Sequence, residues 1–175
     1  MLPDEDLGGA PIIVSALFGK ADFGWLDGLR RAHFPPDRNV IAAHLTLFHH
    51  LPPSLAGELH ARLRAATAHA PRPPATIDRL LPLGRGVALG VRSPDLAAIR
   101  ADLAEAFAGC LTPQDRAGWR PHVTIQNKVA PAEAKALLAG MSAGFTPRPL
   151  VIAGLASYHY RGGPWELIGR YLFSG

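Results

Sequence analysis

Short apolar segments alternate with longer amphipathic segments along most of the chain. Short apolar runs bounded by glycine and proline are typical of strands, whereas apolar positions that recur every three or four residues are typical of helices. The pattern predicts strands at residues 11–18, 44–51, 75–83, 86–91, 122–129, 149–160 and 165–173, and helices at residues 21–33, 54–68, 93–108 and 131–138. Because strands and helices are interspersed and several strands are neighbours in sequence, we expect an α+β fold with largely antiparallel sheets.

Proline, serine and glycine mark the ends of these elements. Pro35 and Pro36 end the first helix, because proline lacks the N–H that a helix interior requires. Ser54 and Ser93 precede helices and are suited to accept a hydrogen bond from the first turn. Residues 84–86, Gly-Arg-Gly, predict the tight turn of a hairpin.

The chain contains an internal repeat. Residues 44–47, His-Leu-Thr-Leu, match residues 122–125, His-Val-Thr-Ile, and each motif is followed by a proline and then a helix. The matched positions beyond the motifs are Leu51 with Val129, Pro53 with Pro131, Ala56 with Ala134, and Leu59 with Leu137. Two copies of one unit predict two lobes related by a pseudo-twofold axis, with helices outside and a central groove, in a single domain over residues 1–175.

The strand geometry places the polar residues of each motif together. Side chains alternate across a strand, so His44 and Thr46 share one face and the leucines beside them share the other. The same division holds for His122 and Thr124. Since the apolar positions should pack against helices, we expect both polar pairs to face the groove between the lobes.

Two imidazoles and two hydroxyls in one groove suit displacement at phosphorus. Histidine has an unperturbed pKa of roughly 6.5, so one imidazole can accept a proton while the other donates one near neutral pH. One of His44 and His122 would activate a water or a ribose hydroxyl, and the other would protonate the leaving oxygen. The hydroxyls of Thr46 and Thr124 would donate hydrogen bonds to the non-bridging phosphate oxygens. This scheme requires no metal, no other cofactor and no covalent intermediate.

The composition narrows the class of protein. Hydrophobic residues make up 48% of the chain and charged residues 18%, which is sufficient for a buried core, and the net charge of +4 is compatible with an anionic ligand such as RNA or a nucleotide. Cys110 is a single cysteine that cannot form an internal disulfide, and we expect it to be buried and unreactive. Residues 1–10 are acidic and polar, unlike a signal peptide, and no apolar stretch reaches the length of a membrane span. We therefore expect a soluble, cytoplasmic, monomeric protein.

The paired motifs resemble those of the 2H phosphoesterase superfamily, and in particular those of its bacterial RNA 2′,3′-cyclic phosphodiesterases, also called 2′-5′ RNA ligases. The resemblance rests on His44-Leu45-Thr46, on His122-Val123-Thr124, on Pro121 before the second motif and on the order of strands and helices. It implies a two-lobed fold that opens an RNA 2′,3′-cyclic phosphate, or cleaves a 2′-linked ribonucleotide, to give a 2′-phosphate, with ligation as a possible reverse reaction. It also implies that His44 and His122 are catalytic and that Thr46 and Thr124 bind phosphate.

One departure from the family pattern concerns the substrate. Members of the family often have a basic residue shortly after the second motif, but here Gln126 and Asn127 come first and the nearest basic residue is Lys128. Both RNA ends and small nucleotides therefore stay open as partners. Aromatic and basic side chains can stack on bases or pair with phosphates. The candidates are Phe48, with core packing as the alternative, Lys128, and Tyr158, Tyr160 and Arg161, which cluster with Trp165 around the last hairpin and have ordinary hairpin packing as the alternative.

Two other interpretations stay open, a nucleotide- or RNA-binding module without turnover and a metal-dependent hydrolase. Strand alternation turns His49 away from the face of His44 and puts His50 about 20 Å from His44, at ~3.3 Å per residue, so these histidines do not predict a metal site. The direction of proton transfer cannot be determined from the motifs. We assign His44 as the acid and His122 as the base for ring opening by water.

Overall fold

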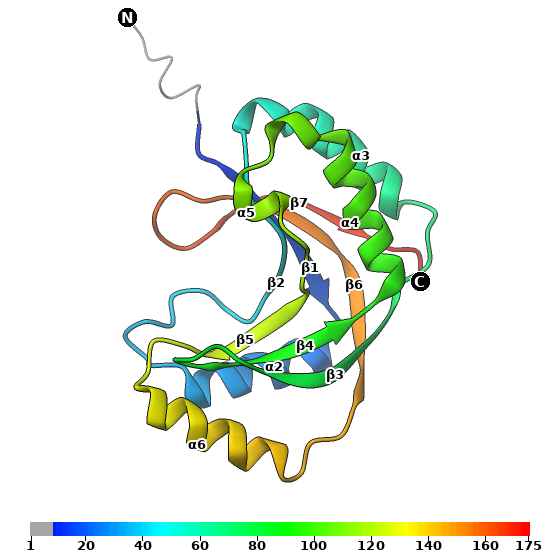
Figure 1. The fold of residues 1–175 in the computed structure, drawn as a ribbon. Coiled ribbons are helices and arrows are strands. Elements are labelled where there is room, and N and C mark those ends of the chain that lie inside the picture. The colour runs from blue at the N-terminus through cyan, green and yellow to red at the C-terminus, as the bar shows by residue number, and fades with distance from the viewer. Residues whose placement is uncertain (1–8) are drawn as a thin grey trace, which may run out of the picture.

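The computed structural model describes residues 9–175, and in this part of the chain seven strands form one antiparallel sheet (Figure 1). The strands are β1 (Ile12–Phe18), β2 (Leu45–Leu51), β3 (Pro74–Pro82), β4 (Val87–Arg92), β5 (His122–Gln126), β6 (Arg148–His159) and β7 (Glu166–Leu172). The helices are α2 (Lys20–His33), α3 (Ala56–Thr67), α4 (Pro94–Ala106), α5 (Pro113–Arg116) and α6 (Pro131–Ser142), with short 3-10 turns η1 (Pro53–Leu55) and η2 (Ala108–Cys110). The α+β class predicted from the sequence is confirmed.

The long strand β6 joins the two lobes. The sheet order is β2-β1-β6-β3-β4-β5, and β7 also pairs with β6. Residues 152–159 of β6 pair with β1, whereas residues 148–151 pair with β3. One lobe thus contains β2, β1 and β7, and the other contains β3, β4 and β5. The two motif strands, β2 and β5, are edge strands at the two ends of this order, and the sheet curves so that they approach each other (Figure 1).

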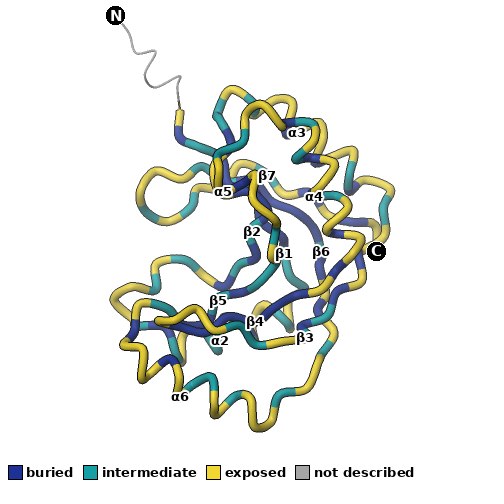
Figure 2. Tube along the Cα trace, in the orientation of Figure 1, coloured by how far each residue is buried: buried dark blue, intermediate teal, exposed yellow. Residues whose placement is uncertain are grey.

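The helices cover the outer sides of both lobes, as the repeat predicts (Figure 1). Helix α3 packs on β6 and β7, and α6 packs on β3 and β4. Helix α2 precedes the first motif in the chain but packs on β5, which carries the second motif. Figure 2 shows the strands as the most buried part of the trace, with exposed positions on the outer helices and the loops. The core is therefore continuous across the lobes, with buried residues from both.

Strand β2 does not keep the simple alternation that its sequence predicts. The pairing of β1 with β2 contains two register shifts, between Ile12 and Val14 and between Val14 and Ser15. Extra residues in one strand of a pair are β-bulges, which turn the following side chains to new directions. As a result Leu47 and Phe48 are both fully buried, whereas His49 and His50 are both exposed.

Most of the predicted element ends are close to the observed ones. The Ser93 side chain accepts a hydrogen bond of 3.3 Å from the Leu96 amide and caps α4, as expected. Ser54 instead lies inside η1, because the chain closes a 3-10 turn at Pro53 before α3 begins. Cys110 is exposed at the end of η2, so the expectation that it is buried was wrong.

Two expectations concern the environment of the chain. Within residues 9–175, none of the helices has both the length and the apolar character needed to cross a bilayer. The acidic start of the chain, which the sequence distinguishes from a signal peptide, falls largely in residues 1–8 and lies outside the described residues.

We expect Gly86→Ala to destabilise the fold and Gly57→Ala to stabilise it. A Cβ atom at Gly86 would overlap the backbone oxygen of Gln126, so the hairpin turn would have to move away from β5 at a cost of about 1–3 kcal/mol. Gly57 lies in α3 with no atom within 4 Å of the added Cβ, so alanine there should add about 0.5–1 kcal/mol. Urea unfolding of both variants measures the difference. Equal stabilities would show that the turn does not need close contact with β5.

Candidate active site

The four motif side chains that the sequence pairs line one cavity of about 360 Å³ between the lobes. His44 and Thr46 reach it from the start of β2, and His122 and Thr124 from β5. The intervening residues of both motifs are buried in the core, so the division of faces within each motif is as expected. The further lining includes His49, Arg100, Gln114, Asp115, Trp119, Arg120 and Trp165.

The two motif histidines are held by the same local hydrogen bond. Nδ1 of His44 lies 2.8 Å from the carbonyl oxygen of Ala42, and Nδ1 of His122 lies 2.7 Å from the carbonyl oxygen of Arg120. A carbonyl oxygen can only accept, so Nδ1 carries a hydrogen in both rings. In the neutral form, Nε2 is then the nitrogen with a free lone pair. Each ring is thereby oriented with Nε2 available for proton exchange with a ligand.

The environment of His44 strongly favours its neutral form. Burial lowers the pKa of His44 to about 4, and the positive charges of Arg30, His122 and His49 act in the same direction. The hydrogen bond to the Ala42 carbonyl opposes the shift but does not cancel it. At neutral pH, His44 of the free protein is therefore deprotonated and able to accept a proton.

An aromatic side chain from the β6–β7 connection completes the surroundings of His44. The Trp165 ring meets the imidazole edge-on, with 4.7 Å between ring centroids and an angle of 61° between the planes. Tyr158 lies behind it, 5.5 Å from Trp165 between centroids, and burial raises the pKa of the Tyr158 hydroxyl. The sequence groups Trp165 with the aromatic and basic side chains of the last hairpin but does not place it against a motif histidine. Its position just after a Gly-Gly-Pro turn gives no sign in the sequence that it contacts His44.

Side chains from outside the motifs bond to the backbone of both edge strands. Arg30, buried in α2, donates to the carbonyl oxygen of Thr124 at 2.9 Å. Arg100, buried in α4, donates to the carbonyl oxygen of Leu47 at 3.1 Å, and the Trp119 indole donates to that of Thr46 at 3.0 Å. Edge strands have backbone groups without a neighbouring strand. These bonds fix the strand segments that carry the two threonines.

Asp115 performs a similar role for the end of β2. Its carboxylate is buried and accepts from the backbone amides of His49 and His50 at 2.8 and 2.9 Å, and from the His49 ring at 3.2 Å. Burial by itself would raise the pKa of Asp115, but these hydrogen bonds outweigh burial and hold the pKa below its ordinary value. The short helix α5 that carries Asp115 was not predicted, because four residues give no periodic signal.

The remaining predicted site residues have separate positions. Phe48 is fully buried under the Arg100 guanidinium, which lies 4.3 Å from the ring centroid, so Phe48 packs in the core and is not available to a ligand. Lys128 is exposed in the turn after β5 and has a positive φ of 65°. Tyr160 and Arg161 are exposed, and Arg161 pairs with Glu166. Of the five, Tyr158 lies beside the motif residues.

The side chain of His49 does not point away from the face of His44, although strand alternation predicts that it does. The bulges in β2 bring its side chain into the same cavity as His44, where it contacts Asp115. In residues 9–175, no group of three or more histidine, cysteine, aspartate or glutamate side chains is arranged to hold a metal ion. The donors that surround the cavity are instead imidazoles, hydroxyls and guanidinium groups, which suit an oxyanion and proton transfer.

Solved structures with the same architecture exist at low sequence identity. Escherichia coli LigT complexed with 3′-AMP is 19% identical, with a TM-score of 0.61 over 95% of this chain and 99% of that chain. The same protein complexed with NADP+ is 20% identical, with a TM-score of 0.60 over the same shares. A protein of Thermus thermophilus is 14% identical, with a TM-score of 0.56 over 94% of this chain and 98% of its own. These similarities establish the fold.

The family follows from the sequence match. The model of the 2′-5′ RNA ligase superfamily matches residues 19–164, a range that includes both motifs. The chain therefore belongs to this superfamily, the 2H phosphoesterases, as the paired motifs indicate. A search of curated proteins finds no match.

We expect the low pKa of His44 to make the protein less stable in mild acid. The unfolded chain binds a proton at His44 below about pH 6.5, whereas the folded protein binds it only near pH 4. The free energy of unfolding therefore decreases as the pH falls from 6.5 towards 4. At pH 5 the loss is about 2 kcal/mol. Urea unfolding at pH 8 and pH 5 measures it, with His44→Gln as the comparison. If the variant loses as much stability as the wild type, His44 does not have this pKa.

Proposed function

We propose that the protein is a metal-independent phosphodiesterase that opens an RNA 2′,3′-cyclic phosphate, or cleaves a 2′-linked ribonucleotide, to a 2′-phosphate. The observation that carries the proposal is the meeting of both His-x-Thr motifs in one cavity, with each imidazole held by the same Nδ1 bond. Membership of a superfamily of phosphoesterases and ligases supports an enzyme. Reverse ligation to a 2′-5′ linkage would use the same groups.

The reaction requires two proton transfers and one exchange of bonds at phosphorus. One histidine removes a proton from water as the water oxygen attacks phosphorus, and the bond from phosphorus to O3′ breaks. The other histidine gives its proton to O3′, which leaves the phosphate on O2′. Thr46 and Thr124 donate to the non-bridging oxygens, where negative charge increases in the transition state. Arg120 also lines the cavity and adds positive charge.

The protonation state of His44 favours one direction of transfer. With a pKa of about 4, His44 is neutral in the free protein and is ready to act as the base. His122 is then the acid. This is the opposite of the assignment made from the sequence, where nothing distinguishes the two motifs. The difference arises from burial, which depends on what surrounds each motif in the folded chain.

Nucleotides are the class of partner that best fits the site. The E. coli LigT structures with 3′-AMP, NADP+ and ATP show that this structural neighbour binds nucleotides. In the present chain, the polar cavity, the basic side chains around it and the net charge of +4 suit the same kind of anion. A protein that binds nucleotides without turnover would use the same groove. A negative activity assay would support this alternative.

We expect His44→Ala and His122→Ala each to reduce kcat/KM on adenosine 2′,3′-cyclic phosphate by about two to four powers of ten. Each substitution removes one of the two proton carriers while the strands remain supported by their backbone bonds. The measurement is the rate of 2′-AMP formation, followed by chromatography that separates 2′-AMP from 3′-AMP. Circular dichroism of both variants checks that they are folded.

His69→Gln is the matched control, because His69 is exposed just after α3 and lies outside the cavity. It should retain full activity, and EDTA should leave the wild-type rate unchanged. Full activity in both alanine variants would contradict the assignment. Loss of activity on chelation would support a metal-dependent hydrolase instead. Binding of 2′-AMP without turnover would support the binding module.

We expect the fall of kcat/KM on the acid side to occur only below about pH 5, as His44 gains a proton near pH 4. The profile of kcat/KM reports the free enzyme, so a base with this pKa is already functional throughout the neutral range. Initial rates after dilution from a neutral stock avoid slow acid unfolding. A kcat/KM that already falls between pH 7 and pH 5 would show that the catalytic base is not a His44 with this pKa.

A further inference from the structure

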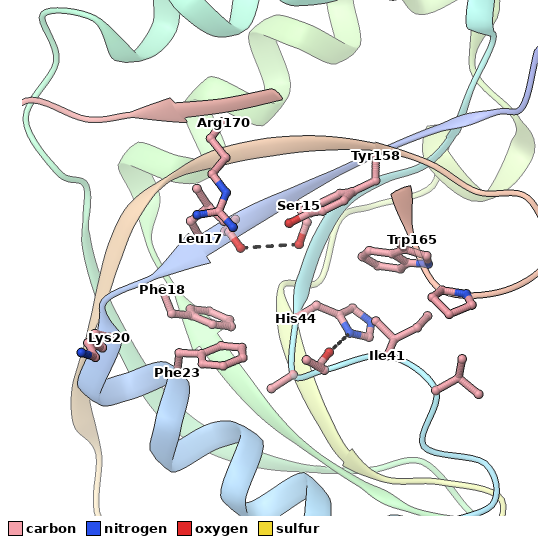
Figure 3. A pocket seen from close by; sticks show the side chains of 15 residues that line it. Ser15, Leu17, Phe18, Lys20, Phe23, Ile41, His44, Tyr158, Trp165 and Arg170 are labelled. Carbon is pink, nitrogen blue, oxygen red and sulfur yellow. Dashed lines mark hydrogen bonds between the residues drawn. The ribbon is translucent and has the colours of Figure 1, made fainter. Parts of the chain in front are cut away.

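A second cavity opens directly beside the motif site (Figure 3). It has a volume of about 530 Å³ and shares His44 and Trp165 with the motif cavity. Its other walls come from β1, from the start of α2 and from residues 40–43. A volume of this size lies within the range of roughly 300–1,000 Å³ that small-molecule sites occupy. Because the two cavities meet at His44, one ligand can extend through both.

Four aromatic side chains line this cavity. Figure 3 shows the rings of Phe18 and Phe23 next to each other on one side, with Tyr158 and Trp165 on the other. Phe23 is 39% exposed and Val40, which also lines the cavity, is 58% exposed, so apolar side-chain surface is accessible to a ligand here. Flat aromatic walls suit a nucleobase, since the face of every base can stack on an aromatic ring.

Two cationic side chains also line this cavity, Arg170 from β7 and Lys20 from the start of α2. Within the described residues, neither makes a hydrogen bond or an ion pair, in contrast to Arg161 on the same hairpin. Figure 3 shows the Arg170 side chain reaching from β7 towards Ser15 and Leu17 on β1. A guanidinium without a partner at the wall of an aromatic cavity is suited to bind an anion.

The strand register places Arg170 on the same face as the phosphate-binding threonine of the first motif. Arg170 pairs with Ala156, Ala156 pairs with Ser15, and Ser15 pairs with Thr46. Directly paired residues of antiparallel strands point to the same side of a sheet. Three strand spacings of ~4.8 Å separate Thr46 from Arg170, about 14 Å between Cα atoms. A ligand that lies along this row can touch both residues.

We propose that the second cavity holds the nucleoside of the substrate and that Arg170, assisted by Lys20, binds a second phosphate on the 5′ oxygen of that nucleoside. The inference rests on the proposed function and specifies its substrate class. The reacting phosphate lies between the motifs, the base stacks in the aromatic cavity, and the 5′-phosphate meets the cation at the far side. The preferred substrate is therefore a nucleotide with phosphate at both ends of the ribose, as at the 3′ end of an RNA, rather than a nucleoside cyclic phosphate with a free 5′ hydroxyl.

The test compares two substrates that differ only at the 5′ oxygen, adenosine 2′,3′-cyclic phosphate and its 5′-phosphorylated form. The wild type should have the higher kcat/KM on the 5′-phosphorylated substrate. Arg170→Gln should lower that value by roughly tenfold to a hundredfold, because a hydrogen bond to a charged group is lost, and should change the value for the 5′-hydroxyl substrate by less than about twofold. Lys20→Gln should show a smaller loss of the same kind.

Arg92→Gln is the control, because Arg92 is exposed at the end of β4 and its loss changes the net charge equally. It should leave both rates unchanged, which separates local recognition from long-range attraction. Equal losses on both substrates in Arg170→Gln, or no loss on either, would overturn the inference.

A binding measurement separates this inference from the catalytic proposal. Isothermal titration with adenosine 2′,5′-bisphosphate and with 2′-AMP requires no turnover. If neither cyclic substrate is hydrolysed but the bisphosphate binds more tightly, and this preference is lost in Arg170→Gln, the recognition is established and the catalytic proposal alone has failed. Equal affinities for the two ligands in the wild type would overturn the inference even if hydrolysis is observed.

Discussion

The site depends on how two edge strands of the sheet are held. Both His-x-Thr motifs lie on edges, β2 and β5, where one side of each strand has no neighbouring strand. A buried arginine from a packed helix bonds to each of these strands, Arg30 to the Thr124 carbonyl and Arg100 to the Leu47 carbonyl. Without such partners the backbone groups would be buried unpaired, at a cost of about 1–3 kcal/mol each. The same bonds that stabilise the edges also fix the two threonines opposite each other.

The two arginines show that the lobes depend on each other. Arg30 comes from α2, which precedes the first motif, yet it supports the second motif, and Arg100 comes from α4 in the second half, yet it supports the first. Each guanidinium also lies over a phenylalanine ring, Phe34 for Arg30 and Phe48 for Arg100. Neither half of the chain therefore contains all of the contacts that position its own motif.

The repeat is symmetric in its motifs and asymmetric in its surroundings. His44 and His122 make the same bond from Nδ1 to the carbonyl oxygen two residues earlier. His44, however, lies against Trp165 and beside the aromatic cavity, and its burial lowers its pKa to about 4. Duplicated strands thus supply two equivalent imidazoles, and the segments around the first one make them inequivalent.

The sequence by itself determined the α+β class, the two lobes and the pairing of the motifs, because strand periodicity and an in-register repeat are local signals that survive in a single chain. The sequence did not determine the directions in which the side chains of Phe48 and His49 point. These depend on two bulges in β2, which arise from the pairing of β2 with β1. The low pKa of His44, the contact with Trp165 and the row that aligns Arg170 with Thr46 were decided only by the tertiary structure. Burial and strand register are relations between segments far apart in the chain, and the pattern within one segment does not contain them.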